Sequence, residues 1–474
     1  MEAPERRSSP ANGVDRISGL PDAVLGTVIS LLPTKDGVRT QALSPRWSHL
    51  WRSAAPLNLD AGISLCADAV RRASIVSTIL SVHPGPARRF HFPSIRLADD
   101  ADGHAELDRW FNSPALNNLE DLDISYDHWE PGYLLPPSAL LRFASTLLSA
   151  KFGFWDFPSE IAAAPALSFP VLKRLTLWCI TISPDAFRVV VSACHSLESL
   201  LLWEINFEGC LRLSSETLRS VGFHGGFCPG QELVIEEAPR LRTMLTLHIL
   251  TGGETIRVIQ APRLEILGPL SPFNFKLEIA SVLFQQMVPV SLTESISTVK
   301  VLALRYHGNI NAVRKVLRCF PYLEKLYIIW HKPVSSKDVH QFGYEPVFAM
   351  ACHEGCFEEM ESRNRYEYDP LDPIECLESN LKKMVMKNYE GSGPDVRFAK
   401  FFVLNAKVLN EIEFAVPKNF DKKWVADQHS LLQVENRASR DARFEFRRGF
   451  ANYGTYMDIT DLSMEDPFEC MLSR

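Results

Sequence analysis

The segment that decides the N-terminal fold reads DRISGLPD at residues 15–22 and LSPRWSHLW at residues 43–51. Proline suits the first position of a helix, because its missing N–H would be unpaired there anyway. Pro21 and Pro45 therefore predict two helix starts, with Ser44 capping the second of them. Thr34 is a suitable cap for another short helix over residues 35–42. The segment thus predicts three short helices in succession.

These helices carry more apolar side chains than three short helices can bury among themselves. Apolar residues recur at three- and four-residue steps in the first helix and on one face of the last, namely Val24, Leu25, Val28, Ile29, Leu32, Trp47, Leu50 and Trp51. A helix-turn-helix reader of DNA would need a basic, polar third helix. Aromatic side chains are instead enriched at protein–protein interfaces. We therefore expect this surface to bind a protein.

The same motifs resemble the F-box of plant F-box proteins, apart from Pro45, where the family usually has a basic residue, and Gly37, where alanine is common. The resemblance implies a helical module at residues 15–60 that docks on a Skp-type adaptor and, through it, on a cullin. The residues that it assigns to the adaptor contact are Leu20, Pro21, Leu25, Ile29, Leu32, Pro33, Val38, Leu43, Trp47, Leu50 and Trp51.

The bulk properties are those of an ordinary soluble globular protein. The chain has 474 residues, 46% hydrophobic and 23% charged, with a net charge of −7, so nothing draws it to nucleic acid or to an anionic membrane. Residues 1–14 are expected to be disordered and lack a signal-peptide core. The ten dispersed cysteines favour a reducing compartment. We expect the cytoplasm, the nucleus or both.

Residues 61–330 are predicted to alternate helices with strands. The spacing of apolar residues predicts a helix over residues 69–82, a strand over residues 90–97 and a helix over residues 106–110. From residue 116 an apolar-x-x-apolar-x-apolar unit recurs, as in Leu172, Leu175 and Leu177. Its first positions lie 21–28 residues apart, except for one interval of 35. This period is typical of leucine-rich repeats.

A strand of such a repeat cannot bury its apolar face alone, so neighbouring repeats must stack into a solenoid. The interval of 35 residues predicts a degenerate copy near Leu277–Leu283. Between strands, residues 183–194 are predicted to form a helix, whereas the links at 211–216 and 254–260 are too short for one. We therefore expect an α/β fold with an irregular arc of repeats.

The rhythm stops at residues 331–373, which are predicted to be an insertion. Cys352, His353 and Cys356 form a single cluster there, whereas a structural zinc site needs four ligands, so no metal is expected. Two further apolar triads, at Leu381, Met384 and Met386 and at Leu409, Ile412 and Phe414, flank residues 396–408, whose apolar residues have helix spacing, so the spacing predicts a strand–helix–strand unit. With the motifs FAKFF at residues 398–402 and RASRDARFEF at residues 437–446, residues 374–450 resemble the FBD domain of plant F-box proteins. Residues 451–474 are acidic and are expected to form a loose tail.

No catalytic constellation is evident in the sequence. There is no phosphate-binding glycine loop, zincin motif or nucleophile elbow. Asp121 and Asp123 are interpreted as solvated loop charges. We predict a non-catalytic substrate-recognition subunit of a Skp–cullin–F-box ubiquitin ligase, without a cofactor and with an unknown target protein.

Two alternatives remain open. The first is an interaction scaffold without a ligase. The second is a small-molecule-gated receptor. A receptor for an anionic cofactor would need lysines or arginines at equivalent repeat positions, and no such cluster is apparent from the sequence.

Overall fold

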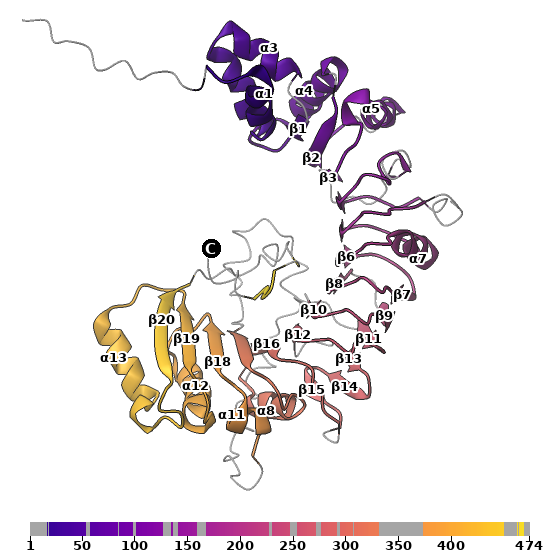
Figure 1. Cartoon of the computed structure of the whole chain (residues 1–474). Helices are drawn as coiled ribbons and strands as arrows, with labels where there is room; N and C mark the ends of the chain where they lie inside the picture. The colour runs from indigo at the N-terminus through magenta and orange to yellow at the C-terminus, as the bar shows by residue number, and fades with distance from the viewer. Residues whose placement is uncertain are drawn as a thin grey trace, which may run out of the picture. The chain divides into compact units, whose positions relative to one another are not determined.

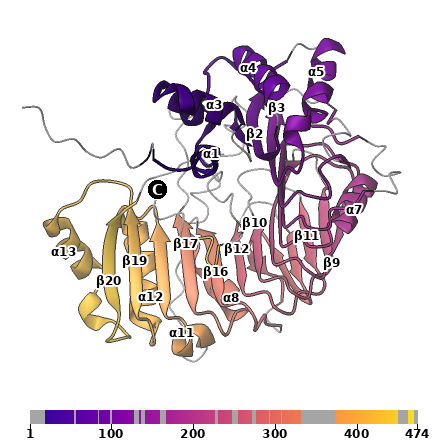
Figure 2. The ribbon, with the colours of Figure 1, turned by 45° about the horizontal axis from the view of Figure 1, so that its top comes forward.

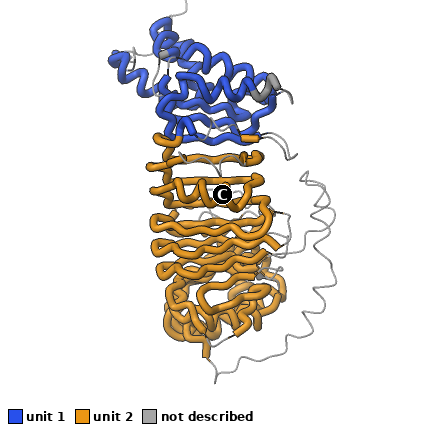
Figure 3. Tube along the Cα trace, turned by 90° about the vertical axis from the view of Figure 1, so that its right-hand side faces the viewer, with its two compact units in different colours: residues 1–127, 138–143 blue, residues 128–137, 144–474 orange. Residues whose placement is uncertain are grey.

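The structure is a computed structural model that describes residues 17, 19–53, 57–83, 85–97, 101–126, 134–135, 141–158, 167–226, 230–246, 254–271, 276–291, 294–306, 308–330, 373–449, 462 and 464–468. The chain divides into two compact units (Figure 3). Unit 1 comprises residues 1–127 and 138–143, and unit 2 comprises residues 128–137 and 144–474. The expected disordered lead at 1–14 and the cysteine cluster at 352–356 lie outside the described residues.

Unit 1 begins with the predicted helices: α1 (Asp22–Ser30), α2 (Thr34–Arg39) with the 3₁₀ turn η1 (Thr40–Ala42), and α3 (Pro45–Ser53). Pro21 is the N-cap of α1 rather than its first residue. The prediction that Thr34 caps α2 is wrong, because Pro33 is the N-cap. The Thr34 hydroxyl is engaged elsewhere: it accepts from the Asp60 N–H at 2.6 Å and donates to the Asn58 carbonyl at 3.1 Å.

A three-stranded parallel sheet follows in unit 1, in the order β1-β2-β3. Its elements are β1 (Leu57–Asp60), α4 (Ala69–Val82), β2 (Ala87–Ile95), α5 (Ala101–Phe111), η2 (Pro114–Leu116) and β3 (Asp121–Tyr126). Helix α4 has the predicted bounds, and Asp68 caps it by accepting from the Arg71 N–H. The strand predicted at residues 90–97 begins and ends earlier. Alternation of helices and strands therefore starts in unit 1, as predicted.

The main sheet of unit 2 is parallel, and its described neighbours follow the order β4-β5-β6-β8-β10-β12-β16-β17-β18-β19-β20 (Figures 1 and 2). The strands are β4 (Ser149–Gly153), β5 (Arg174–Trp178), β6 (Ser199–Ile205), β8 (Ser220–Gly225), β10 (Thr243–Thr246), β12 (Ile266–Leu270), β16 (Val301–Tyr306), β17 (Lys325–Trp330), β18 (Lys383–Lys387), β19 (Glu411–Val416) and β20 (Arg443–Arg448). The apolar triads predicted as repeat strands lie on these strands or enter them, and they are buried. The repeat prediction is confirmed.

Helices return the chain between some of the strands of unit 2. They are α7 (Pro184–Ala193), α8 (Ile310–Arg318), α11 (Glu375–Ser379), α12 (Gly393–Asn405) and α13 (Lys422–Leu431). The helix predicted at residues 183–194 is α7, and the Ser183 side chain caps it. The strand–helix–strand order predicted at the C-terminal end is β18-α12-β19. Helix α13 was not predicted.

Elsewhere the returns of unit 2 form a second sheet, which the sequence did not reveal. It has the order β15-β14-β13-β11-β9-β7. Its strands are β7 (Cys210–Ser214), β9 (Glu232–Glu237), β11 (Thr255–Val258), β13 (Lys276–Ile279), β14 (Val282–Gln285) and β15 (Val288–Pro289). A return of four to six residues is too short for a stable helix but sufficient for a strand that pairs with its neighbours.

The degenerate repeat predicted near Leu277–Leu283 is wrong. Strands β13 and β14 pair antiparallel in the second sheet, and β12 pairs directly with β16 in the main sheet. The extra residues in the interval of 35 therefore form the antiparallel pair β13–β14 of the second sheet, not another repeat of the main sheet. Among the described residues, no helix is long and apolar enough to cross a membrane.

The expectation of a loose acidic tail also fails for the residues that the structure describes. Leu462, Pro467 and Phe468 are buried against unit 2. The physical reason is a set of tertiary contacts: the Asp466 carboxylate pairs with Lys325 of β17, and Phe468 packs on the buried ring of Tyr327.

Candidate protein-interaction surfaces

The start of α1 is held by a polar clamp from α3. The Arg46 guanidinium contacts the Asp22 carboxylate at 2.5 Å and 2.7 Å and also donates to the Leu20 carbonyl at 2.6 Å. Asp22 lies in the first turn of α1, where a carboxylate also meets the positive end of the helix. The clamp therefore joins the two motifs of the N-terminal segment, 15–22 and 43–51, in one surface.

Helix α1 and its C-cap carry two rows of apolar side chains, one buried and one exposed. Leu25 and Ile29 point inward and form a buried cluster with Trp47 and Leu50 of α3, against which Trp51 packs. Val24, Val28 and Leu31 remain 43%, 43% and 61% exposed. Because each stripe repeats at three- and four-residue steps, both belong to the same amphipathic pattern. The inward stripe makes the helical core, and the outward stripe leaves apolar surface in contact with water.

The residues assigned to the adaptor contact divide in the same way. Leu25, Ile29, Trp47 and Leu50 are core residues, and Leu32 and Trp51 are half-buried. The remaining ones are exposed, namely Leu20, Pro21, Pro33, Val38 and Leu43. Sequence reasoning did not nominate the exposed Ile17, Val24, Val28 and Leu31. For Val24 and Val28 the signal was present, because they were already recognised as part of the apolar pattern of the helix.

Gly37 has a steric role in this group of helices. A Cβ at this position would lie 2.9 Å from the Trp51 indole nitrogen, so alanine would force the indole to move. The Trp51 ring also meets His83 edge-on, with ring centroids 6.3 Å apart. The departure from the family pattern at Gly37 is thus accommodated by close packing of Trp51 against α2.

Unit 1 also contains a histidine between two carboxylates. His91 of β2 lies 2.9 Å from Asp60 on β1 and 3.3 Å from Asp123 on β3. Burial lowers the pKa of His91, but the two carboxylates outweigh burial and raise it above its usual value. The interpretation of Asp121 and Asp123 as loop charges is wrong, since both lie within β3 and pair with Arg89 and His91 respectively.

Unit 2 offers a second surface, the inner face of its main sheet. Successive side chains of a strand point to opposite faces, and the register places one row of residues across this face. The row continues from Ala303 of β16 through Tyr327 of β17 and Val385 of β18 to Glu413 of β19. Leu201 and Leu245 belong to the same buried cluster as Ala303, Tyr327 and Val385. This row of the inner face is therefore apolar as far as Val385 of β18 and becomes charged at Glu413 of β19.

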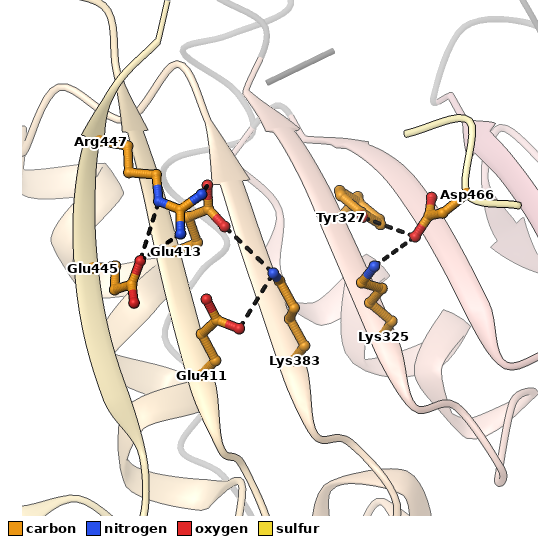
Figure 4. Close-up of polar contacts among 8 residues, drawn as sticks. All are labelled: Lys325, Tyr327, Lys383, Glu411, Glu413, Glu445, Arg447 and Asp466. Carbon is orange, nitrogen blue, oxygen red and sulfur yellow. Dashed lines mark hydrogen bonds and ion pairs between the residues drawn. The ribbon is translucent and has the colours of Figure 1, made fainter. Parts of the chain in front are cut away.

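The charged end of the inner face is a network of ion pairs (Figure 4). Glu413 is 1% exposed and lies 3.4 Å from both Lys383 and Arg447. Lys383 also contacts Glu411 at 3.2 Å, and Arg447 contacts Glu445 at 2.7 Å. A buried carboxylate needs such compensation, because removal from water is costly for an unpaired charge.

Two lysines occupy equivalent repeat positions on the inner face, which the sequence analysis overlooked. Lys325 of β17 lies opposite Lys383 of β18 in the register. Each follows the first apolar position of its repeat by two residues, so the signal was present in spite of the insertion between them. Both lysines contact carboxylates, which argues against a simple basic floor for an anionic cofactor.

The cysteines and the groups of metal-ligating side chains were compared across the described residues. The cysteines there are free thiols, and burial raises the pKa of Cys194 and Cys376 to about 12 and that of Cys319 to about 11. Within the same ranges, no group of three or more histidine, cysteine or acidic side chains could hold a metal ion.

Comparison with known proteins gives a consistent result. Residues 107–328 match the family model described as "FBD-associated F-box protein At5g56370, LRR repeats", and residues 369–414 match the FBD model. The chain is 24% identical over 451 residues to the putative F-box/FBD/LRR-repeat protein At1g66300 of Arabidopsis thaliana, covering 90% of this chain and 92% of that protein.

Two further Arabidopsis thaliana relatives match more locally. The FBD-associated F-box protein At1g66310 is 29% identical over 251 residues, which cover 50% of this chain and 53% of the relative. The F-box/LRR-repeat protein At3g03360 is 30% identical over 195 residues, which cover 40% and 38%. The chain thus spans about half the length of the first of these relatives. By its repeats, its FBD region and these relatives, the chain is similar to plant F-box/FBD/leucine-rich-repeat proteins.

Proposed function

We propose that the protein is the substrate-recognition subunit of a Skp–cullin–F-box ubiquitin ligase. Residues 15–60 are the F-box and bind the Skp-type adaptor, residues 61–330 and 374–450 form the repeat and FBD scaffold, and that scaffold holds a target protein. The chain itself forms no bond. It acts by raising the local concentration of target lysines near a conjugating enzyme carried elsewhere in the complex.

The observation that carries this proposal is the exposed apolar surface of the N-terminal helices. Large apolar side chains between residues 17 and 43 are 36–65% exposed, namely Ile17, Leu20, Val24, Val28, Leu31, Val38 and Leu43. This many exposed apolar side chains on three short helices support an interaction site. The Arg46 clamp orders the Leu20 end of the surface, so a partner meets a shaped surface there.

The test is adaptor capture with purified full-length protein and a purified Skp-type adaptor. We expect a stable complex with wild type and at least tenfold weaker binding for the double variant Leu20→Asp/Pro21→Ala, because a charge enters the apolar contact. Ile259→Asp is the matched control, since Ile259 is a comparably exposed apolar residue of unit 2. It should bind the adaptor as wild type does.

Absence of a complex with wild type would contradict the proposal. Adaptor binding without recruitment of a cullin would favour the alternative of an interaction scaffold that serves no ligase. Cullin recruitment is measured by adding the purified cullin to the preformed adaptor complex.

A further inference from the structure

Leu462 and Phe468 of the C-terminal residues belong to the buried cluster on the inner face of unit 2. Asp466 contacts the same face at Lys325 and Tyr327 (Figure 4). We propose that the inner face at β16–β18 is a binding site for a short, turned protein segment with an aspartate two residues before an aromatic side chain. Residues 464–468 occupy this site until a target segment displaces them. The inference rests on the proposed function, since it names the chemistry by which the repeats hold a target.

The first element of the site recognises a carboxylate. The Asp466 Oδ2 atom lies 2.6 Å from Lys325 Nζ and accepts from the Tyr327 hydroxyl at 3.0 Å. Tyr327 is fully buried, and the Lys325 and Asp466 side chains are only 20% and 12% exposed. Charge-assisted hydrogen bonds that are shielded from water are among the strongest polar contacts. This pair of donors therefore selects an acidic side chain.

The second element accepts an aromatic ring and the backbone that carries it. Phe468 is fully buried, and its ring centroid lies 5.3 Å from that of Tyr327. The Phe468 carbonyl accepts from Lys387 Nζ at 3.3 Å, and the Phe468 N–H donates to the Asp466 Oδ1 atom at 3.1 Å. The aspartate therefore folds the segment so that the aromatic side chain follows it into the site, which sets the two-residue spacing.

The third element is the apolar row beside these contacts. Leu462 and Phe468 belong to one buried cluster with Leu245, Ile266 and Ala303, which lie on β10, β12 and β16. On the opposite side, Lys383 is already held by Glu411 and Glu413. A bound segment thus meets apolar strands on one side and a compensated ion-pair network on the other, which confines it to β16–β18.

The contacts shown for residues 464–468 include one ion pair, two hydrogen bonds to the sheet and one buried ring. Each is of a kind that a separate segment of the same chemistry can also make. The segment follows β20, which ends at Arg448, so it is tethered within reach of the site. Tethering corresponds to an effective concentration in the millimolar range. A separate segment of the same chemistry must therefore bind weakly to wild type and far better once the chain's own segment is weakened.

The experiment measures binding of a fluorescent peptide with the sequence of residues 460–469 to full-length protein. We expect the variant Asp466→Ala/Phe468→Ala to bind the peptide at least tenfold more tightly than wild type. Adding Lys325→Ala to this variant should reduce the affinity at least tenfold again. Lys382→Ala is the matched control, because Lys382 lies beside β18 and pairs with Glu324 at 2.9 Å rather than with the segment. It should leave peptide binding unchanged.

A second form of the experiment leaves every contact of the site intact. A specific protease site is inserted within residues 451–458, and the linker is cut after folding. We expect the released segment to dissociate on dilution and the peptide to bind in its place. If the released segment stays bound through gel filtration at submicromolar concentration, residues 464–468 are a permanent part of the core and the proposal is overturned.

The outcomes separate this inference from the proposed function. Peptide binding is measured without adaptor, and adaptor capture is measured on the same samples. If the protein captures the adaptor but neither the Asp466→Ala/Phe468→Ala variant nor the cut protein binds the peptide, the proposed peptide site is wrong and the ligase function is unaffected. If these proteins bind the peptide but do not capture the adaptor, the peptide site is supported and the proposed ligase function is wrong.

Discussion

The N-terminal helices and the strands β16–β19 are both amphipathic, yet they treat their apolar residues differently. In the strands, the apolar residues of the repeat pattern, such as Leu326 and Ile412, are fully buried. In helices α1 to α3, one stripe is buried and a second one stays in contact with water. A repeat strand gains a neighbour on each side and buries its face against both. Three short helices have no repeating neighbours of this kind, and the proposed function assigns their surplus apolar surface to a partner.

The largest expected effect tests the buried side of this comparison. Phe414 of β19 is fully buried, and its ring stacks on Phe446 of β20 with centroids 4.7 Å apart. We expect Phe414→Ala to lower the free energy of unfolding by about 3–5 kcal/mol, through lost transfer energy and a cavity. Urea unfolding followed by tryptophan fluorescence measures it. Leu431→Ala, at an exposed position of α13, is the control and should change stability by less than about 0.5 kcal/mol.

A smaller effect compares the two stripes of α1 directly. Leu25 is fully buried, whereas the adjacent Val24 is 43% exposed. We expect Leu25→Ala to cost about 2–5 kcal/mol of stability. We expect Val24→Ala to cost less than about 0.5 kcal/mol and to weaken adaptor binding instead. Thermal unfolding and adaptor titration of both variants measure the contrast. Equal losses of stability would show that α1 does not have an inward and an outward stripe.

The smallest expected effect is a pH-dependent change in the stability of unit 1 that depends on His91. The carboxylates of Asp60 and Asp123 raise the pKa of His91 in the folded protein, despite burial, above its unfolded value near 6.5. The stabilisation is therefore fully present below about pH 6.5 and is lost as the pH rises through the folded pKa. We expect His91→Gln to lower the melting temperature of unit 1 more at pH 5.5 than at pH 8.5.

His195→Gln serves as the control for this pH dependence, because His195 is an exposed residue of unit 2. Its melting temperature should follow that of wild type at both pH values. A loss in His91→Gln that is the same at pH 5.5 and pH 8.5 would show that the imidazolium charge does not contribute to stability.

Much of the fold follows from local patterns. The helix at 69–82 and the strands of the main sheet were predicted because their apolar residues repeat with the period of the element. The second sheet was not, because strands of four to six residues such as β9 and β11 owe their pairing to neighbours 21 or more residues away. Pairing of that kind leaves only a weak local pattern.

The candidate surfaces show the same difference between features that follow from local patterns and features that depend on long-range packing. The amphipathic pattern of α1 and the F-box motif were sufficient to nominate the N-terminal helices, but not to separate Leu25 from Val24, since both fit one helical period. Which stripe faces inward depends on where α3 places Trp47 and Leu50. The contact of Asp466 with Lys325 joins residues 141 positions apart, and the acidic composition of residues 451–474 predicted solvation instead.

The sequence by itself therefore determined the repeat period, the elements that follow from it and the apolar surplus near the N-terminus, because these depend on spacing along the chain. Only the tertiary structure decided which apolar stripe is buried, which returns form the second sheet and where Asp466 and Phe468 lie. These features depend on packing between residues far apart in the chain, and the free energy of that packing is not encoded in local periodicity.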